Sequence, residues 1–187
     1  MSEDARFEDG EDKALNIGAF DKNDLEIVSS LIQDSILPAS EIKWLSNSNK
    51  LALLINRFRW EDKSLALSQG RKLERVQSLL MISHVKNISS NGFSPKQKDK
   101  VLSILSISFD GDEGGSGSIL ILLSGDGAVR VDVDALEIDL RDVSMPYIAP
   151  SGLLPEHKTD IWKVSFLGRL EKMKNRRYFG RYNLRKK

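Results

Sequence analysis

A change of phase in one alternating segment constrains the fold of this chain more than any other sequence feature. In Ala128–Leu140, AVRVDVDALEIDL, apolar residues occupy odd positions up to Val133 and even positions from Leu136 onward. Successive side chains of a β-strand point to opposite faces, so a regular strand would separate the two apolar sets. We therefore expect a β-bulge near Asp134–Ala135, which inserts one residue and returns both sets to the core.

This interpretation gives a structural role to the acidic residues in and beside the segment, which are Asp132, Asp134, Glu137, Asp139 and Asp142. With both apolar sets in the core, Asp132, Asp134, Glu137 and Asp139 fall on the opposite face, which we expect to be solvated. The alternative is a hard cation, which prefers several oxygen ligands at one centre. Because the spacing does not match a calcium-binding EF-hand loop, we expect the solvated face and no metal site.

The rest of the chain predicts one helix followed by several strands. Asp21 is a suitable N-cap for a helix with an apolar stripe from Leu25 to Ile32, and Pro38 limits its extent. Hairpin turns are expected at Asn47–Asn49 and Asp126–Gly127. The expected strands are Glu41–Ser46, Lys50–Phe58, Glu74–Ile88, Val101–Phe109, Ile119–Leu123 and Ala128–Leu140.

These elements predict an α+β fold, in which one N-terminal amphipathic helix packs on a curved antiparallel sheet of about six strands. The successive hairpins favour a meander that is barrel-like or similar to a pleckstrin-homology sheet, with the strand order left open. We expect an acidic disordered segment at 1–18, a single domain at 19–150, and a linker with a helical basic tail at 151–187.

Composition limits the location and the chemistry. The 187 residues include no cysteine, so a disulfide, a thiolate metal site and a cysteine nucleophile are excluded. No long apolar run or secretory signal is present, and a cytoplasmic location is expected. The two histidines, His84 and His157, are far apart in the sequence, and no phosphate loop or nucleophile elbow occurs. We therefore assign no catalytic residue, no metal and no cofactor.

The charge is distributed unevenly along the chain. Residues 157–187 hold eleven basic and two acidic residues, a net charge of +9, whereas residues 1–156 hold 17 basic and 25 acidic residues, a net charge of −8. A tail that mixes cations with aromatic residues suits RNA or an anionic membrane surface. The alternative is a terminal helix that docks on the acidic domain, or an extension that is foreign to it. The candidate polyanion-binding residues are Arg176, Arg177, Tyr178, Arg181, Tyr182 and Arg185.

The block Asn56–Glu61, NRFRWE, is the strongest candidate for a ligand site. Arg57 and Arg59 would supply forked donors to an anion or nucleotide, beside Trp60 as a stacking platform and Glu61. The alternative is structural, with the aromatic rings in the core, while the arginines share the opposite face and pair with acids such as Glu61 and Glu74.

Several strings in the chain resemble one known family. They are LIQDSI at 31–36, LLINRFRWE at 53–61, ERV at 74–76, VLSILSISF at 101–109 and AVRVDVDALEIDLRD at 128–142. Together they are similar to a family of small alphaproteobacterial proteins known as a domain of unknown function, over about residues 15–150, and NRFRWE is the most specific part. The resemblance implies no activity, and the basic tail departs from the family pattern.

The sequence favours a non-catalytic binding or interaction module, because no set of residues has catalytic spacing. Such a module would bind a protein through a sheet edge or through the NRFRWE surface, and self-association stays open. The alternatives are a small anion-binding or nucleotide-binding protein or enzyme that uses the NRFRWE surface, and association of the basic tail with RNA or an anionic membrane.

Overall fold

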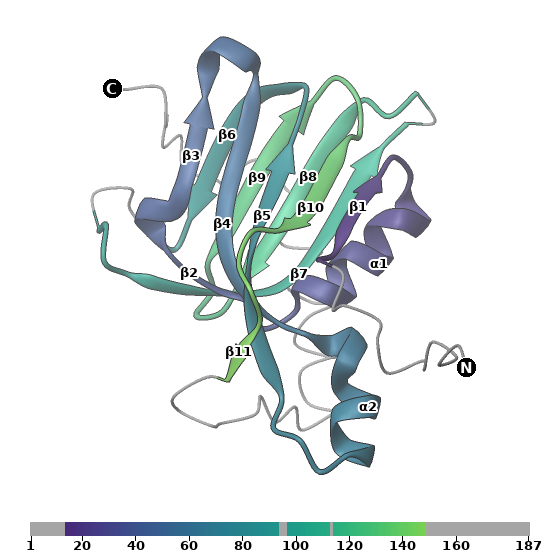
Figure 1. The fold of residues 1–187 in the computed structure, drawn as a ribbon. Helices are drawn as coiled ribbons and strands as arrows, with labels where there is room; N and C mark the ends of the chain where they lie inside the picture. Colours follow the sequence, from purple (N-terminus) through teal and green to yellow (C-terminus); the bar gives the residue numbers. More distant parts are fainter. Residues whose placement is uncertain (1–13, 94–96, 113, 149–187) are drawn as a thin grey trace.

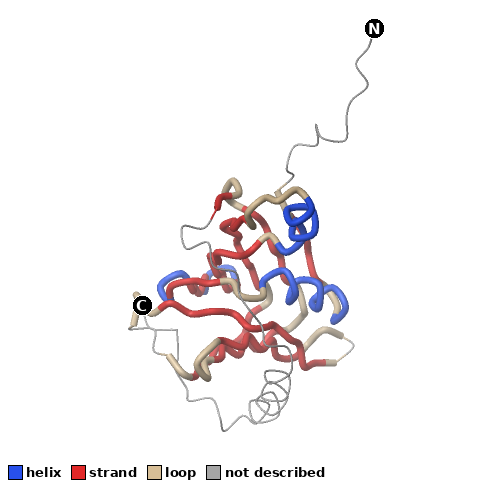
Figure 2. Tube along the Cα trace, turned by 90° about the horizontal axis from the view of Figure 1, so that it is seen from below, coloured by secondary structure: helices blue, strands red, loops and turns tan. Residues whose placement is uncertain are grey.

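The fold is an antiparallel sheet of 11 strands that is bent into two halves (Figure 1). The computed structural model describes residues 14–93, 97–112 and 114–148. Seen from below, strands make up most of this described trace and the helices are short (Figure 2). Along the sheet the strand order is β1-β10-β5-β4-β2-β7-β8-β9-β6, while β3 adds to β4 and β11 adds to β5.

One short strand connects the two halves, because β2 (Ile36–Pro38) pairs with both β4 and β7. The first half contains β1 (Asn16–Ala19), β3 (Ile42–Leu45), β4 (Lys50–Phe58), β5 (Glu74–Ile82), β10 (Ile138–Asp142) and β11 (Tyr147–Ile148). The second half contains β6 (Val85–Asn91), β7 (Val101–Gly111), β8 (Gly117–Leu123) and β9 (Ala128–Val133). The helical elements are α1 (Lys22–Ile32), α2 (Lys63–Ser68) and the 3₁₀ turns η2 (Ala39–Glu41), η3 (Ser46–Ser48) and η4 (Trp60–Asp62).

The first helix forms where its capping signal predicts. Asp21 Oδ1 accepts a hydrogen bond of 2.8 Å from the backbone N–H of Asp24, which satisfies one of the free donors of the first turn. The apolar stripe Leu25, Val28 and Ile32 is buried against the core. The helix thus covers one end of the space between the two halves.

The space between the halves is filled by aliphatic side chains. Inward-facing residues of the first half, such as Leu53, Leu80 and Leu140, join residues of the second half, such as Ile121 and Val131, in one buried cluster. Each of these five side chains is at most 1% exposed. The sheet is therefore closed over a packed core, and binding sites have to be sought at its edges and ends.

The predicted fold class, one N-terminal helix on about six strands, is wrong. The reason is that two long apolar runs, Glu74–Ile88 and Ala128–Leu140, each cross from one half of the sheet to the other. The run Glu74–Ile88 is two strands, because β5 ends at Ile82 and β6 begins at Val85 in the other half. The described residues form 11 strands and two short α-helices rather than a six-stranded meander. The expected helical tail lies outside the described residues.

The change in apolar alternation between Val133 and Leu136 marks a crossing between the halves. Strand β9 ends at Val133 in the second half, and β10 begins at Ile138 in the first half. The expected bulge near Asp134–Ala135 is therefore wrong, since the chain leaves one half there and enters the other. Both apolar sets still reach the core, because each half presents its own inner face to it.

The turns are close to their predicted places. Asn49 has a φ of 52° in the β3–β4 hairpin, as its position predicts. Strands β8 and β9 form the expected hairpin, but the left-handed residues are Gly125 and Asp126 rather than Asp126 and Gly127. Strand β1 begins at Asn16, so the folded chain starts before the boundary expected at residue 19.

We expect Gly92→Ala to destabilise the domain much more than Gly125→Ala. Both glycines have a positive φ, at 79° and 67°, which costs an alanine about 1 kcal/mol. A Cβ on Gly92 would also lie 2.7 Å from Gly127 Cα, whereas nothing lies within 4 Å of one on Gly125. Urea unfolding of both variants measures the difference, and equal losses would contradict the close backbone approach.

Candidate functional site

Arg57 of the NRFRWE block points into the molecule. In β4, residues 51, 53, 55 and 57 share the inner face, and β5 and β10 place Ser78 and Asp142 beside one another on that same face. The Arg57 side chain is 0% exposed. A fully buried guanidinium needs partners for its charge and for all of its N–H groups.

Two carboxylates and two further oxygens surround this guanidinium. Glu61 accepts from Nη1 and Nη2 at 2.8 Å each, and Asp142 accepts from Nε at 3.1 Å and from Nη2 at 2.9 Å. The backbone oxygen of Phe58 accepts from Nη1 at 3.2 Å, and Ser78 Oγ accepts from Nε at 3.0 Å. Ser78 also donates to Asp142 at 2.6 Å, so the network is continuous.

These contacts decide the charge state of Arg57. Burial acts to lower the pKa of the Arg57 guanidinium, but the hydrogen bonds and charges of Glu61 and Asp142 outweigh it, and the pKa is raised. Arg57 is therefore a permanent cation between two anions. A ligand anion would have to displace one of these carboxylates to reach it.

The other residues of the block also have partners within the protein. Arg59 Nη1 pairs with Glu74 Oε2 at 2.7 Å, and Trp60 Nε1 donates to the backbone oxygen of Gln33 at 2.9 Å. The Trp60 ring lies 5.3 Å from the Phe58 ring. Glu61, the fourth predicted ligand residue, is the partner of Arg57. The structure thus brings the four residues together around η4, and their binding of a ligand stays a prediction.

A stack of cations and rings continues from this block. Arg75 lies 3.7 Å from the centre of the Phe58 ring, and Lys63 Nζ lies 5.3 Å from the centre of the Trp60 ring. Burial lowers the pKa of Arg75, against the opposing effects of Tyr147 and Asp34. The two rings therefore hold η4 and the start of β5 together through cation–π contacts.

The acidic residues of the phase-change segment are divided among separate partners. Asp134 pairs with Lys86, Glu137 with His84, and Asp142 with Arg57. Burial acts to raise the pKa of Asp132, but hydrogen bonds from Ser118, Arg130 and Asn87 outweigh it and the pKa is lowered. The Asp142 side chain is 6% exposed, because it lies on the inner face of β10 with Leu140. No group of three potential metal ligands occurs within residues 14–148 as far as they are described.

A polar hollow of about 490 Å³ lies where the chain crosses between the halves. His84 has a φ of 56°, and its Nε2 lies 2.8 Å from Glu137 Oε2. The hydrogen bond with His84 lowers the pKa of Glu137. Backbone hydrogen bonds from Ser83 to Glu137 and from Asp134 to His84 fix this corner, so the side-chain hydrogen bond between His84 and Glu137 joins the two crossings.

A second opening lies between β3 and β6. Each of these strands pairs with one neighbour only among the described strands, β3 with β4 and β6 with β9. The backbone N–H of Val85 donates to Asn49 at one end of the opening, and Ala39 and Ser40 donate to Lys100 and Lys98 at the other. The two edges are thus tied together at both ends and unpaired between them, and we call this opening the β3–β6 cleft.

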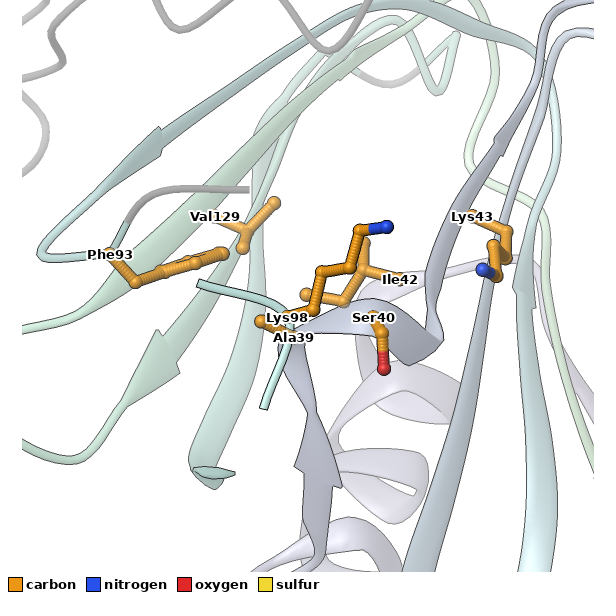
Figure 3. A pocket seen from close by; sticks show the side chains of 7 residues that line it. All are labelled: Ala39, Ser40, Ile42, Lys43, Phe93, Lys98 and Val129. Carbon is orange, nitrogen blue, oxygen red and sulfur yellow. The ribbon is translucent and has the colours of Figure 1, made fainter. Parts of the chain in front are cut away.

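The β3–β6 cleft has a cavity of about 320 Å³ at the end where η2 and the start of β3 meet the segment after β6, and no residue of β6 itself lines this cavity (Figure 3). This size is at the lower end of the range for ligand pockets, about 300–1,000 Å³. Its walls combine an apolar floor with two lysines, and they comprise Ala39, Ser40, Ile42, Lys43, Phe93, Lys98 and Val129. Neither Lys43 nor Lys98 forms an ion pair with another residue of the described part of the chain. No sequence motif marks this cleft, because its residues come from separate segments of the chain.

Comparison with known proteins adds one match. The family model described as a protein of unknown function, DUF2948, matches residues 15–157. The chain belongs to the DUF2948 family. No curated protein and no solved structure matches it.

The DUF2948 match confirms the family resemblance inferred from NRFRWE and the flanking strands. It contains Arg57, the hollow beside His84 and the β3–β6 cleft. The candidate tail residues, from Arg176 to Arg185, lie beyond the DUF2948 match and outside the described residues. None of the helices in the described ranges has the length and the hydrophobicity needed to cross a bilayer.

We expect Arg57→Met to lower the free energy of unfolding by about 3–5 kcal/mol, because it leaves two carboxylates without their cation. The control is Arg71→Met, which removes an exposed arginine from Asp62 and should cost about 1 kcal/mol or less. Urea unfolding at neutral pH distinguishes them, and similar losses would show that the Arg57 network adds no special stability.

A second prediction concerns pH. The lowered pKa of Glu137 means that its ionised carboxylate stabilises the fold above the ordinary glutamate pKa of about 4.3, and that this stabilisation is lost as the pH falls. The stability advantage of wild type over Glu137→Gln should therefore be largest near pH 6 and should shrink toward pH 3. Glu26→Gln on the exposed face of α1 is the control. If the difference in the free energy of unfolding between wild type and Glu137→Gln stays constant with pH, ionised Glu137 does not stabilise the fold.

Proposed function

We propose that this domain is a non-catalytic binding module that holds an extended segment of a partner protein in the β3–β6 cleft. The observation that supports the proposal is the pair of unpaired sheet edges, tied together at both ends by the backbone hydrogen bonds of Val85, Ala39 and Ser40. Because these hydrogen bonds fix the separation of the two edges, the cleft is preorganised for binding.

Unpaired edges have a recognised physical use. The free N–H and C=O groups of an edge strand form a template for another strand, and addition of a strand is a common way of binding a peptide. Asn49, in the turn that follows β3, lies next to the start of β6, and Ala39 and Ser40, which precede β3, lie next to the segment after β6. The two strands therefore run in opposite directions. A guest strand between them would pair with one edge or both, and its inward side chains would reach the apolar floor.

The NRFRWE block fits this proposal as a supporting structure. Its arginines are occupied by Glu61, Asp142 and Glu74, and neither Arg57 nor Trp60 lines any of the three described cavities. The block fixes β4, which carries β3 as its neighbour. An arginine network of this kind supports the position of the cleft without contacting a guest.

Selection of short linear peptides displayed on phage tests the proposal. Peptides recovered on wild type should bind it in solution, and Ser40→Trp, which fills the cleft, should lose at least ten-fold in affinity. Leu65→Trp, on the exposed face of α2, is the matched control and should bind as wild type does.

Lys43→Trp is a second cleft variant that can be used if Ser40→Trp fails to fold. Recovery of no binding peptide, or peptides that bind both cleft variants as tightly as wild type, would overturn the proposal. Thermal unfolding of every variant ensures that lost binding does not reflect lost structure.

A further inference from the structure

The walls of the β3–β6 cleft differ from the rest of the domain in charge. The described residues include 17 acidic and 14 basic side chains, a net charge of −3, yet the only charged residues among them that line the cleft are Lys43 and Lys98. Glu41 and Asp99 are neighbours in sequence but do not line it. A cavity whose charged lining consists of two cations favours an anionic guest, because opposite charges attract at close range.

Of the six buried side-chain polar atoms that form no hydrogen bond in the described residues, two belong to β3 and β6, the strands at the cleft. Trp44 Nε1 and Ser90 Oγ are buried and form no hydrogen bond. Trp44 shares the inner face of β3 with Ile42, which lines the cavity. Ser90 pairs with Val129 in the β6–β9 ladder, so its side chain lies on the same face as another lining residue. Ser90 is 1% exposed.

Buried polar groups without partners are rare in native proteins, because each costs free energy. An indole N–H can only donate, and a hydroxyl can donate or accept. Together they fit a guest that brings an acceptor, such as a backbone carbonyl, between β3 and β6. The lysines at the mouth fit carboxylates on the outward side of that same guest.

We infer that the guest is an acidic extended peptide with one apolar anchor side chain, an inference that rests on the proposed function. Its anchor would pack on Ile42, Phe93 and Val129. Its carboxylates would pair with Lys43 and Lys98, and a backbone carbonyl would accept from Trp44 Nε1. Alternation of anchor and carboxylates along the strand would place them on opposite sides, as the cleft requires.

Calorimetry with three synthetic hexapeptides of one length tests this inference. The acidic probe is acetyl-Val-Glu-Phe-Asp-Val-Glu-amide. The neutral probe carries Gln in place of Glu and Asn in place of Asp, and the lysine probe carries Lys at all three acidic positions. The acidic probe should bind at least ten-fold more tightly than the neutral one and should weaken as salt is raised, while the lysine probe should not bind.

Two sets of variants locate the contacts. Lys43→Glu with Lys98→Glu should abolish the preference for the acidic probe, whereas Lys72→Glu, an exposed lysine outside the cleft, should preserve it. Trp44→Phe should weaken the acidic probe on the order of five-fold, the effect of one hydrogen bond. It should not lower the stability of the free protein, since that N–H has no partner there.

The outcomes separate this inference from the proposed function. If the neutral or the lysine probe binds in the cleft as tightly as the acidic one, the cleft is a peptide site but the acidic preference is refuted. If no probe binds while phage peptides of another chemistry do, the inference fails and the proposed function stands. If neither probes nor phage peptides bind, both fail.

Discussion

The buried guanidinium of Arg57 is the interaction on which the first half of the sheet depends. It joins β4 to β5 through Ser78, to β10 through Asp142 and to the turn η4 through Glu61. Asp142 also accepts from the backbone N–H of Leu15, which leads into β1. Because a buried charge is costly without its partners, this one network requires four elements to be in place together. The neighbouring β3, and with it one wall of the β3–β6 cleft, is held by the same frame.

Local signals in the sequence were sufficient where they act over a few residues. The cap at Asp21, the hairpin at Asn49 and the strand Lys50–Phe58 are all present as predicted. Periodicity was insufficient at Ser83–His84 and at Asp134–Glu137, because an apolar run looks the same whether it stays in one half or crosses to the other. The phase change at Asp134 was a real signal, but a bulge and a crossing both shift the alternation by an odd number of residues.

The candidate sites show the same limit. The residue types of NRFRWE suggested a site, and the structural alternative is right in pairing Arg57 with Glu61 and Arg59 with Glu74. It is wrong in placing both arginines on the face opposite the core, because Arg57 is 0% exposed and lies on the inner face of β4. Its other part, both rings in the core, describes Phe58, which is 2% exposed, better than Trp60. The lysines of the β3–β6 cleft are 55 residues apart, and Phe93 and Val129 come from other segments, so no motif joins them. Only the strand order, which the sequence left open, brings them together. A site made by sheet edges is predictable only once the edges are known.

The return of β10 to the first half has a consequence for synthesis on the ribosome. Strands β3, β4 and β5 emerge early, followed by the whole second half, and only then does the chain supply β10 with Asp142. Until that carboxylate emerges from the exit tunnel, nascent Arg57 lacks one of its two counter-ions. Native closure of the first half therefore has to await nearly the entire domain, which makes a stable half-domain intermediate with its native ion pairs unattainable during translation.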